Sequence, residues 1–346
     1  MLRRPRSPGR TRSLFSGLVA GALCLGLAAC GSVQDTSTQN SAAAPSQAAS
    51  AFPVTITHKF GTTTIPKAPE RVVVVGNSTD DLDAVIALGV TPIAYFAKSY
   101  TGTDGVPPWL KGKLDPAKTK IVNASSGVST EEVAALTPDL ILATASFGLE
   151  DEYPNLSKVA PTVGYESEWG AQSWQQHVQI VGKALGKDAS AEQLTKDTEA
   201  KIAQVKTDNA AVAGKTFTAS VGNTPGKIFT LISESDFAVK QIEALGLKLS
   251  PSVAGIAKDT ASSPTGALSP EQLDKLSADL VLISFTSPDL QKAFEDNQLV
   301  KDLPAVKKGN LLIVEFDTIA QLRAPSVIGI PWVLEKLTPA LKKLAA

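Results

Sequence analysis

One stretch of helix followed by strand occurs twice in this chain, and the repetition limits the possible folds more than any other feature. The segment EEVAALTPDLIL at 131–142 matches EQLDKLSADLVL at 271–282. The match includes the leading glutamate, the apolar helix positions, the aspartate before the strand (Asp139 and Asp279) and the Leu-x-Leu of the strand. VGN also occurs before each copy, and IALG in the first half resembles IEALG in the second. We therefore expect two similar lobes.

The segments around these repeats alternate between strand and helix patterns. RVVVV at 71–75 is a short β-branched run, typical of a strand buried on both faces. STDDLDAVIALG follows with apolar residues at helical spacing, and Ser78 with Asp81 three positions later fits a capping box. TPIAYF, LILAT and PTVGY read as further strands. This alternation predicts an α/β fold with two Rossmann-like lobes, each with a central, mostly parallel sheet.

A helix expected from about 190 to 209, capped by Ser190, lies between the two lobes. At 1.5 Å per residue it spans roughly 30 Å and would make a stiff hinge. The expected organisation is a lipoprotein signal peptide at 1–29, a lipidated flexible tether at 30–52, an N-terminal α/β lobe at 53–174, a helical segment with the interlobe helix at 175–209, and a C-terminal α/β lobe at 210–346.

The start of the chain has the pattern of a secretory signal. MLRRPRSPGRTR carries five arginines and no acid, and a short, glycine-containing apolar run from Leu14 to Ala29 follows it. The quartet ending in Cys30, Leu-Ala-Ala-Cys, resembles the bacterial lipobox, whose cysteine is lipidated and becomes the new N-terminus. The next residues are rich in Ser, Gln, Ala and Thr and predict a flexible tether. We expect Cys30 to anchor the protein to the outer face of the cell membrane; a buried thiol in an ordinary secretory signal is the alternative.

Removal of that signal makes the chain acidic. The full chain has 33 basic and 34 acidic residues, so loss of the five arginines leaves 28 against 34, a formal charge near −6. Nucleic acids and anionic membrane surfaces are bound through basic patches, so the composition argues against both as partners. Arg71 and Arg323 are the arginines that remain.

The ordered motifs of the mature chain resemble one family. VTITHKFGTTTIPKAPERVVVVG, DAVIALGVTPIAY, LTPDLIL, VGKALGKDASAEQLTKDTEAKI and LSPEQLDKLSADLVLI occur in the order found in the substrate-binding proteins of iron(III)-siderophore and cobalamin ABC importers. The resemblance covers about 54–342. It implies a class III substrate-binding fold with one long interlobe helix, a ligand held between the lobes with modest closure, and an ABC permease as membrane partner.

The resemblance therefore implies a monomeric receptor that binds a ferric siderophore and delivers it to the permease. Haem or cobalamin binding, or a non-transport envelope adaptor with the same fold, are the alternatives. An enzyme is not expected, because no G-x-G-x-x-G, P-loop, G-x-S-x-G or His-rich metal motif is present; a chelatase is the weakest option. No cofactor is expected, and no direct metal site, because the mature chain offers two histidines and no free thiol.

Ligands of α/β folds bind beyond the carboxyl ends of the strands, where aromatic and polar residues gather in this sequence. The candidate ligand-binding residues are Asn77, Tyr95, Tyr100, Trp109, Phe147, Tyr165, Trp169, Asn223, Phe229, Phe285 and Arg323. Aromatic walls suit the rings and methylene arms of a siderophore, and a guanidinium suits anionic oxygens. The alternatives are ordinary core positions for the aromatics and a surface salt bridge for Arg323.

Four charged positions near helix starts have other expected roles. By resemblance, Glu150 and Glu271 align with the two surface glutamates that dock on permease arginines; compensation of the helix dipole is the alternative. Asp80 and Asp81 are expected to stabilise the first helix and to repel an anion from its N-terminus. His177 is expected to have a structural or surface role.

Overall fold

The computed structural model describes residues 52–99, 105–260, 263 and 265–346, and these fall within one compact unit. The predicted signal peptide, Cys30 and nearly all of the tether lie outside the described residues, as does Tyr100. Within the described part of the chain, no helix is long and apolar enough to cross a membrane.

The first half of this unit contains a parallel sheet of five strands in the order β5-β4-β3-β6-β7. All five residues of β3 are buried, as a β-branched run in the middle of a covered sheet requires. The strands are β3 (Val72–Gly76), β4 (Ala94–Ala97), β5 (Lys120–Asn123), β6 (Leu140–Leu142) and β7 (Thr162–Val163). An antiparallel hairpin precedes them, and the helices between them are short; these elements are β1 (Val54–His58), β2 (Gly61–Ile65), α1 (Asp80–Ala87), η1 (Pro108–Leu110), α2 (Thr130–Ala135) and α3 (Leu149–Val159).

The second half contains a mixed sheet in the order β11-β9-β8-β12-β13, with β10 also paired to β8. The pairs β8–β12, β12–β13 and β8–β10 are parallel, whereas β8–β9 and β9–β11 are antiparallel. Its strands are β8 (Thr216–Thr224), β9 (Lys227–Leu231), β10 (Lys248–Leu249), β11 (Thr265–Leu268), β12 (Leu280–Phe285) and β13 (Leu311–Val314). Its helical elements are η2 (Ala210–Val212), α6 (Phe237–Glu243), η3 (Pro251–Val253), η4 (Pro270–Leu276), α7 (Pro288–Asp296), α8 (Gln298–Asp302), α9 (Pro304–Lys307), α10 (Phe316–Arg323) and α11 (Gly329–Ala345). The predicted α/β fold with two mostly parallel sheets is confirmed.

The sequence repeat corresponds to a hydrogen-bonding arrangement that occurs once in each sheet. In the first sheet the carboxylate of Asp139 accepts hydrogen bonds from the backbone N–H of Glu70 and Arg71 at the start of β3. In the second sheet the carboxylate of Asp279 accepts from the backbone N–H and the hydroxyl of Thr216 at the start of β8. Each aspartate thus ties the strand that it precedes to the neighbouring parallel strand at the same end of the sheet.

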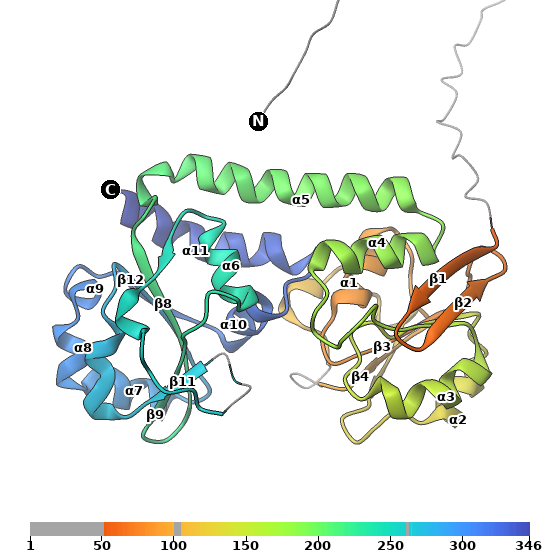
Figure 1. Cartoon of the computed structure of the whole chain (residues 1–346), viewed down its shortest axis with the longest axis horizontal. Coiled ribbons are helices and arrows are strands. Elements are labelled where there is room, and N and C mark those ends of the chain that lie inside the picture. Colours follow the sequence, from red (N-terminus) through yellow and green to blue (C-terminus); the bar gives the residue numbers. More distant parts are fainter. Residues whose placement is uncertain (1–51, 100–104, 261–262, 264) are drawn as a thin grey trace, which may run out of the picture. The chain divides into compact units, whose positions relative to one another are not determined.

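Two helices connect the sheets. Helix α4 (Trp174–Ala184) packs against α1 and against α5 (Asp188–Asp208), and α5 also contacts α11 before the chain enters β8 (Figure 1). The 21 residues of α5 span about 30 Å, so the predicted interlobe helix is present. Its expected cap at Ser190 is wrong, because α5 begins two residues earlier, directly after the turn at Gly186 that ends α4.

A buried hydrogen-bond network joins α1 of the first half to the α10–α11 turn of the second. The hydroxyl of Ser326 donates to Asp83 and accepts from the side-chain amide of Gln321 at 2.6 Å and from the backbone N–H of Gly329 at 3.1 Å. The indole N–H of Trp109 donates to the same Asp83 oxygen at 2.9 Å. All of these side chains are buried, so the contact is shielded from competing water.

Candidate ligand-binding cleft

The topology of the first sheet creates the site. Strands β3 and β6 are neighbours, but the chain continues from β3 to β4 on one side and from β6 to β7 on the other. The loops that follow β3 and β6 therefore diverge, and such a switch point is where open α/β sheets bind ligands. Asn77 holds the two loops in place: its N–H donates to the carbonyl of Ala145, and its side-chain oxygen accepts from the N–H of Phe147 at 2.7 Å.

A cleft of about 720 Å³ opens at this switch point and reaches the second half of the molecule. The first half contributes the loops after β3, β4 and β6 and the segment before α4. The second half contributes the start of α6 and the end of α10. The lining residues are Asn77, Ser78, Asp80, Ser99, Thr144, Ala145, Phe147, Trp169, Gly170, Gln172, His177, Ser235, Asp236, Phe237, Arg323, Ala324 and Pro325. A smaller hollow of about 250 Å³, lined in part by Tyr95, Trp109 and Phe316, shares Asn77, Ser78, Ser99 and Ala324 with it.

Exposed aromatic rings mark this cleft. Phe147, Trp169 and Phe316 are 60%, 46% and 46% exposed, and they are the large hydrophobic side chains that the described residues leave exposed. All three line the cleft or the adjoining hollow. The rings of Phe147 and Trp169 meet edge to face with centroids 5.0 Å apart. Apolar surface gathered in a concavity is a feature of ligand sites, because a ligand removes that surface from water.

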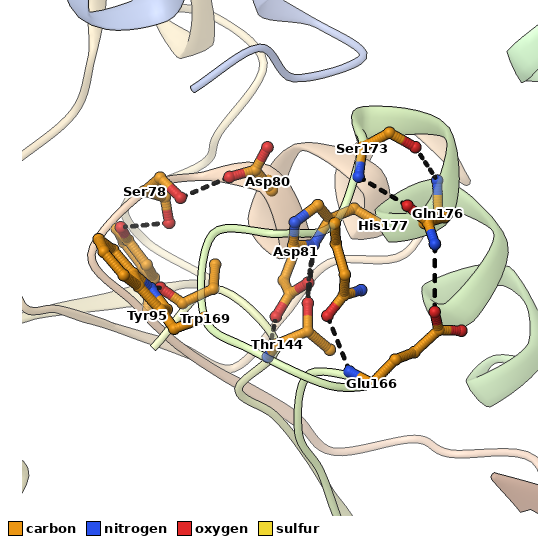
Figure 2. Close-up of polar contacts among 12 residues, drawn as sticks. Ser78, Asp80, Asp81, Tyr95, Thr144, Glu166, Trp169, Ser173, Gln176 and His177 are labelled. Atoms are coloured by element: carbon orange, nitrogen blue, oxygen red, sulfur yellow. Dashed lines mark hydrogen bonds and ion pairs between the residues drawn. The ribbon is translucent and has the colours of Figure 1, made fainter. Parts of the chain in front are cut away.

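Three carboxylates, those of Asp80, Asp81 and Asp83, occupy the first turn of α1. Figure 2 shows the first two with their polar partners. Asp81 accepts from the N–H of Thr144 at 2.7 Å and from its hydroxyl, so it ties α1 to the loop after β6. His177 of α4 completes the group, with Nδ1 2.8 Å from the Thr144 hydroxyl and 3.3 Å from Asp81. The predicted capping box of Ser78 and Asp81 is wrong: the N-cap is Thr79, and the Ser78 hydroxyl bonds instead to Asp80.

Burial and mutual repulsion alter the protonation of this group. Loss of hydration raises the pKa of Asp80, and burial raises the pKa of Asp83 to about 8. Burial also opposes the charged form of His177, but the carboxylates of Asp80 and Asp81 outweigh it and raise its pKa. The expected structural role of His177 agrees with its buried position in this network, although its ring also reaches the cleft.

Arg323 ends α10 and faces the cleft from the second half. Its Nε lies 3.6 Å from the carboxylate of Asp236, which is buried and caps α6 by accepting from the N–H of Ala238. The guanidinium is 45% exposed, so it can still be reached by a ligand. The structure therefore combines both predictions for Arg323, a cleft position and an ion pair.

The sequence-predicted ligand residues divide into three groups. Asn77, Phe147, Trp169 and Arg323 line the cleft, and Tyr95 and Trp109 line the adjoining hollow. Tyr100 lies outside the described residues. Tyr165, Asn223, Phe229 and Phe285 are placed elsewhere: they do not line either hollow.

Each of these four has a physical reason for its position. Tyr165 is fully buried against Phe60, and its hydroxyl donates to Glu150. In the second sheet β8 does not stop where β3 stops but turns back as a hairpin, which carries Asn223 and Phe229 with it. Phe285 packs against Phe294 instead, with ring centroids 5.3 Å apart.

Sequence reasoning missed several lining residues. The strand-end rule points to the segment from Phe316 onward, just after β13, but Phe316 itself was not among the candidate ligand-binding residues. Asp80 and His177 were assigned other roles, and only their tertiary neighbours show that they reach the cleft. Gln172, Asp236 and the other polar lining residues carry no local sequence signal.

The two predicted docking glutamates both lie in the first turn of a helical element. Glu150 is half exposed, accepts from the Tyr165 hydroxyl and lies 3.6 Å from Lys59. Glu271 is exposed, and a hydrogen bond from Ser269 lowers its pKa. Ser269 is the N-cap of η4 and forms a capping box with Gln272.

Among the described residues, no group of three or more His, Cys, Asp or Glu side chains is arranged to hold a metal ion. The family model of the periplasmic binding proteins matches residues 72–318. This range includes both sheets and the cleft-lining residues from Asn77 to Phe237. The chain belongs to the periplasmic binding protein family. The predicted family resemblance is thereby confirmed.

Relatives within the family share most of their length with this chain. A putative ABC transporter substrate-binding lipoprotein of Bacillus subtilis is 28% identical over 84% of this chain and 90% of its own. The ferric-anguibactin-binding protein of Vibrio anguillarum is 26% identical over 77% and 80%. The crystal structure of a periplasmic solute binding protein from Mycobacterium smegmatis superimposes with a TM-score of 0.71 at 27% identity, covering 85% of this chain and 99% of that one.

Proposed function

We propose that this periplasmic binding protein is a lipid-anchored extracytoplasmic receptor that binds a ferric siderophore in the cleft and delivers it to an ABC permease. The observation that carries the proposal is the cleft at the sheet switch point, with its exposed rings of Phe147, Trp169 and Phe316. A volume of about 720 Å³ is within the usual range for sites of small organic ligands, roughly 300–1,000 Å³.

The relatives support the same cargo and the same partner. One is named for ferric-anguibactin binding and another as a substrate-binding lipoprotein of an ABC transporter. In this proposal Cys30 carries the lipid, and the tether separates it from the folded unit. Haem or cobalamin as cargo, and an envelope adaptor without a small ligand, are the alternatives that a binding measurement separates.

The cleft chemistry favours binding without catalysis. The hydroxyl of Thr144 donates its hydrogen bond to Asp81 and not to His177. His177 is therefore not placed to act as a general base that activates this hydroxyl as a nucleophile. A hydrolytic triad needs the opposite order, with the histidine between the hydroxyl and the carboxylate. The proposal therefore includes no cofactor and no reaction: iron stays inside its chelator and is cargo.

The proposal predicts saturable, submicromolar quenching of tryptophan fluorescence when the purified protein is titrated with a ferric siderophore. Trp169 lies half exposed in the cleft, so a bound ferric complex would quench it. The panel includes haem and cobalamin, and calorimetry checks each ligand without relying on fluorescence. Quenching by haem or cobalamin alone would change the cargo, and silence across the panel from a folded sample would favour the adaptor.

The permease contact is a second, separate expectation. Charge reversal of Glu150 and Glu271 to lysine should leave ligand affinity unchanged, because neither lines the cleft, and should reduce uptake at least about tenfold if both pair with permease arginines. Glu335→Lys on α11 is the matched control, since it reverses one exposed charge elsewhere. Undiminished uptake by the double variant would remove the docking role.

A further inference from the structure

The acidic groups that line the cleft and the adjoining hollow outnumber the basic ones. Asp80 and Asp236 line the main cleft and Asp317 lines the adjoining hollow. The described lining residues include one arginine, Arg323. Its Nε lies 3.6 Å from the carboxylate of Asp236, so part of its charge is already neutralised. His177 is the remaining basic group there, and it faces Asp80 and Asp81. The described part of the cleft thus has more carboxylates than cations.

The lysines near the cleft do not reverse this balance. The ammonium of Lys98 donates to the carbonyl of Phe147 and pairs with Glu152 at 3.0 Å. Burial raises the pKa of Asp317, and repulsion by Glu315 raises it further. Attraction by Lys111, which lies outside the hollow, lowers it. The ammonium of Lys240 lies 5.5 Å from the ring centroid of Phe237, which lines the cleft. None of these three lysines itself lines the cleft or the adjoining hollow.

The position most suited to an anion is already filled by the chain itself. The N-terminus of the helix after the first strand of an α/β sheet usually attracts negative groups, because its backbone N–H groups and dipole point outward. Here Asp80, Asp81 and Asp83 occupy that first turn, and Asp81 and Asp83 are fully buried. Asp80 is the member of this group that lines the cleft, so an anionic ligand would meet its carboxyl group at the place where anions otherwise bind.

The exposed rings suit a ligand of the other sign. Phe147, Trp169 and Phe316 are exposed aromatic side chains, and aromatic faces attract cations and pack against methylene chains. Ferric chelates differ in charge by simple addition: three hydroxamates neutralise Fe³⁺, three catecholates leave the complex strongly negative, and citrate complexes are also negative. A pendant ammonium makes a trihydroxamate complex positive.

We infer that this cleft selects ferric complexes of zero or positive charge, the ferric trihydroxamates, and that Asp80 and Asp317 exclude anionic catecholate and carboxylate chelates. The inference rests on the proposed function and adds the class of cargo to it. An excess of acidic over basic groups in a cleft acts on the charge of the ligand, so one charge on the cargo changes affinity measurably.

The test compares two probes with the same iron centre. Ferrioxamine B carries a pendant ammonium, and its N-succinyl derivative carries a carboxylate at that position. Calorimetry on the purified protein should show ferrioxamine B binding at least about tenfold more tightly, with a ratio that shrinks as salt is added. Ferric enterobactin and ferric dicitrate should bind more weakly than either.

Two variants locate the cause. Asp80→Asn and Asp317→Asn should each reduce the ratio between the two probes, and Asp289→Asn, which removes an exposed carboxylate of α7, should leave it unchanged. Asp317→Asn keeps the test valid if Asp80→Asn fails to fold, because Asp317 is only partly buried. Equal affinity for the two probes, or an unchanged ratio in Asp317→Asn, would overturn the inference.

The outcomes also separate the inference from the proposed function. Tight binding of ferric enterobactin or ferric dicitrate would overturn the charge selectivity and leave a siderophore receptor in place. Failure of every ferric complex to bind a folded sample would overturn both.

Discussion

Replacing Phe147 and Trp169 together by alanine should raise the Kd for the bound ferric complex by about 30- to 150-fold. The two rings meet edge to face and form one exposed apolar surface in the cleft. Covering that surface with a ligand contributes about 2–3 kcal/mol, which corresponds to this change in Kd. Because the rings are exposed in the free protein, the free energy of unfolding should change little.

The control is Phe229→Ala, which removes a half-buried ring from β9 that does not line the cleft. Its affinity for the ferric complex should equal that of the unchanged protein. Calorimetry measures both variants, since the double variant lacks the fluorescent reporter at position 169. An affinity loss below about threefold in the double variant would mean that the ligand binds away from these rings.

Ser326→Ala should lower the free energy of unfolding by about 2–4 kcal/mol. The Ser326 hydroxyl has three buried partners, and its loss leaves the Gln321 amide and the Gly329 N–H without a described acceptor and Asp83 with one donor fewer. Leaving a buried polar group without a partner costs more free energy than one hydrogen bond contributes to folding on balance. Urea unfolding followed by circular dichroism measures the change.

The chain provides a close control for this substitution. Ser284 of β12 is as buried as Ser326, but its hydroxyl has no hydrogen-bond partner. Ser284→Ala should therefore be neutral or slightly stabilising, since it removes an unsatisfied polar group from the core. Equal losses in the two variants would show that the network between α1 and the α10–α11 turn adds nothing beyond the burial of a small side chain.

The fold could be predicted because its signals are local. The β-branched run of β3 and the helix-then-strand repeat around Asp139 and Asp279 each indicate their own secondary structure. The order of parallel strands then fixes where the switch point lies, and Asn77 and Phe147 follow from the strand ends.

The remainder of the cleft depends on contacts between distant segments. His177 and Thr144 are neighbours only because α4 packs on α1, and no spacing in the sequence indicates that packing. Asn223 was expected in the cleft by analogy with Asn77, since both follow Val-Gly. The expectation was wrong because β8 continues beyond Gly222, the counterpart of Gly76, and the chain then turns back into the antiparallel strand β9.

Asp139 and Asp279 perform the same task at the same edge of two sheets, yet only the first sheet is parallel throughout. Duplication of a single ancestral half, followed by remodelling of the second copy, accounts for both facts. The first copy kept the switch point and with it most of the residues that line the cleft, whereas the second acquired antiparallel strands. Evolutionary change in cargo preference should therefore concentrate in the N-terminal copy, and exchanging that half between related receptors should transfer their specificity.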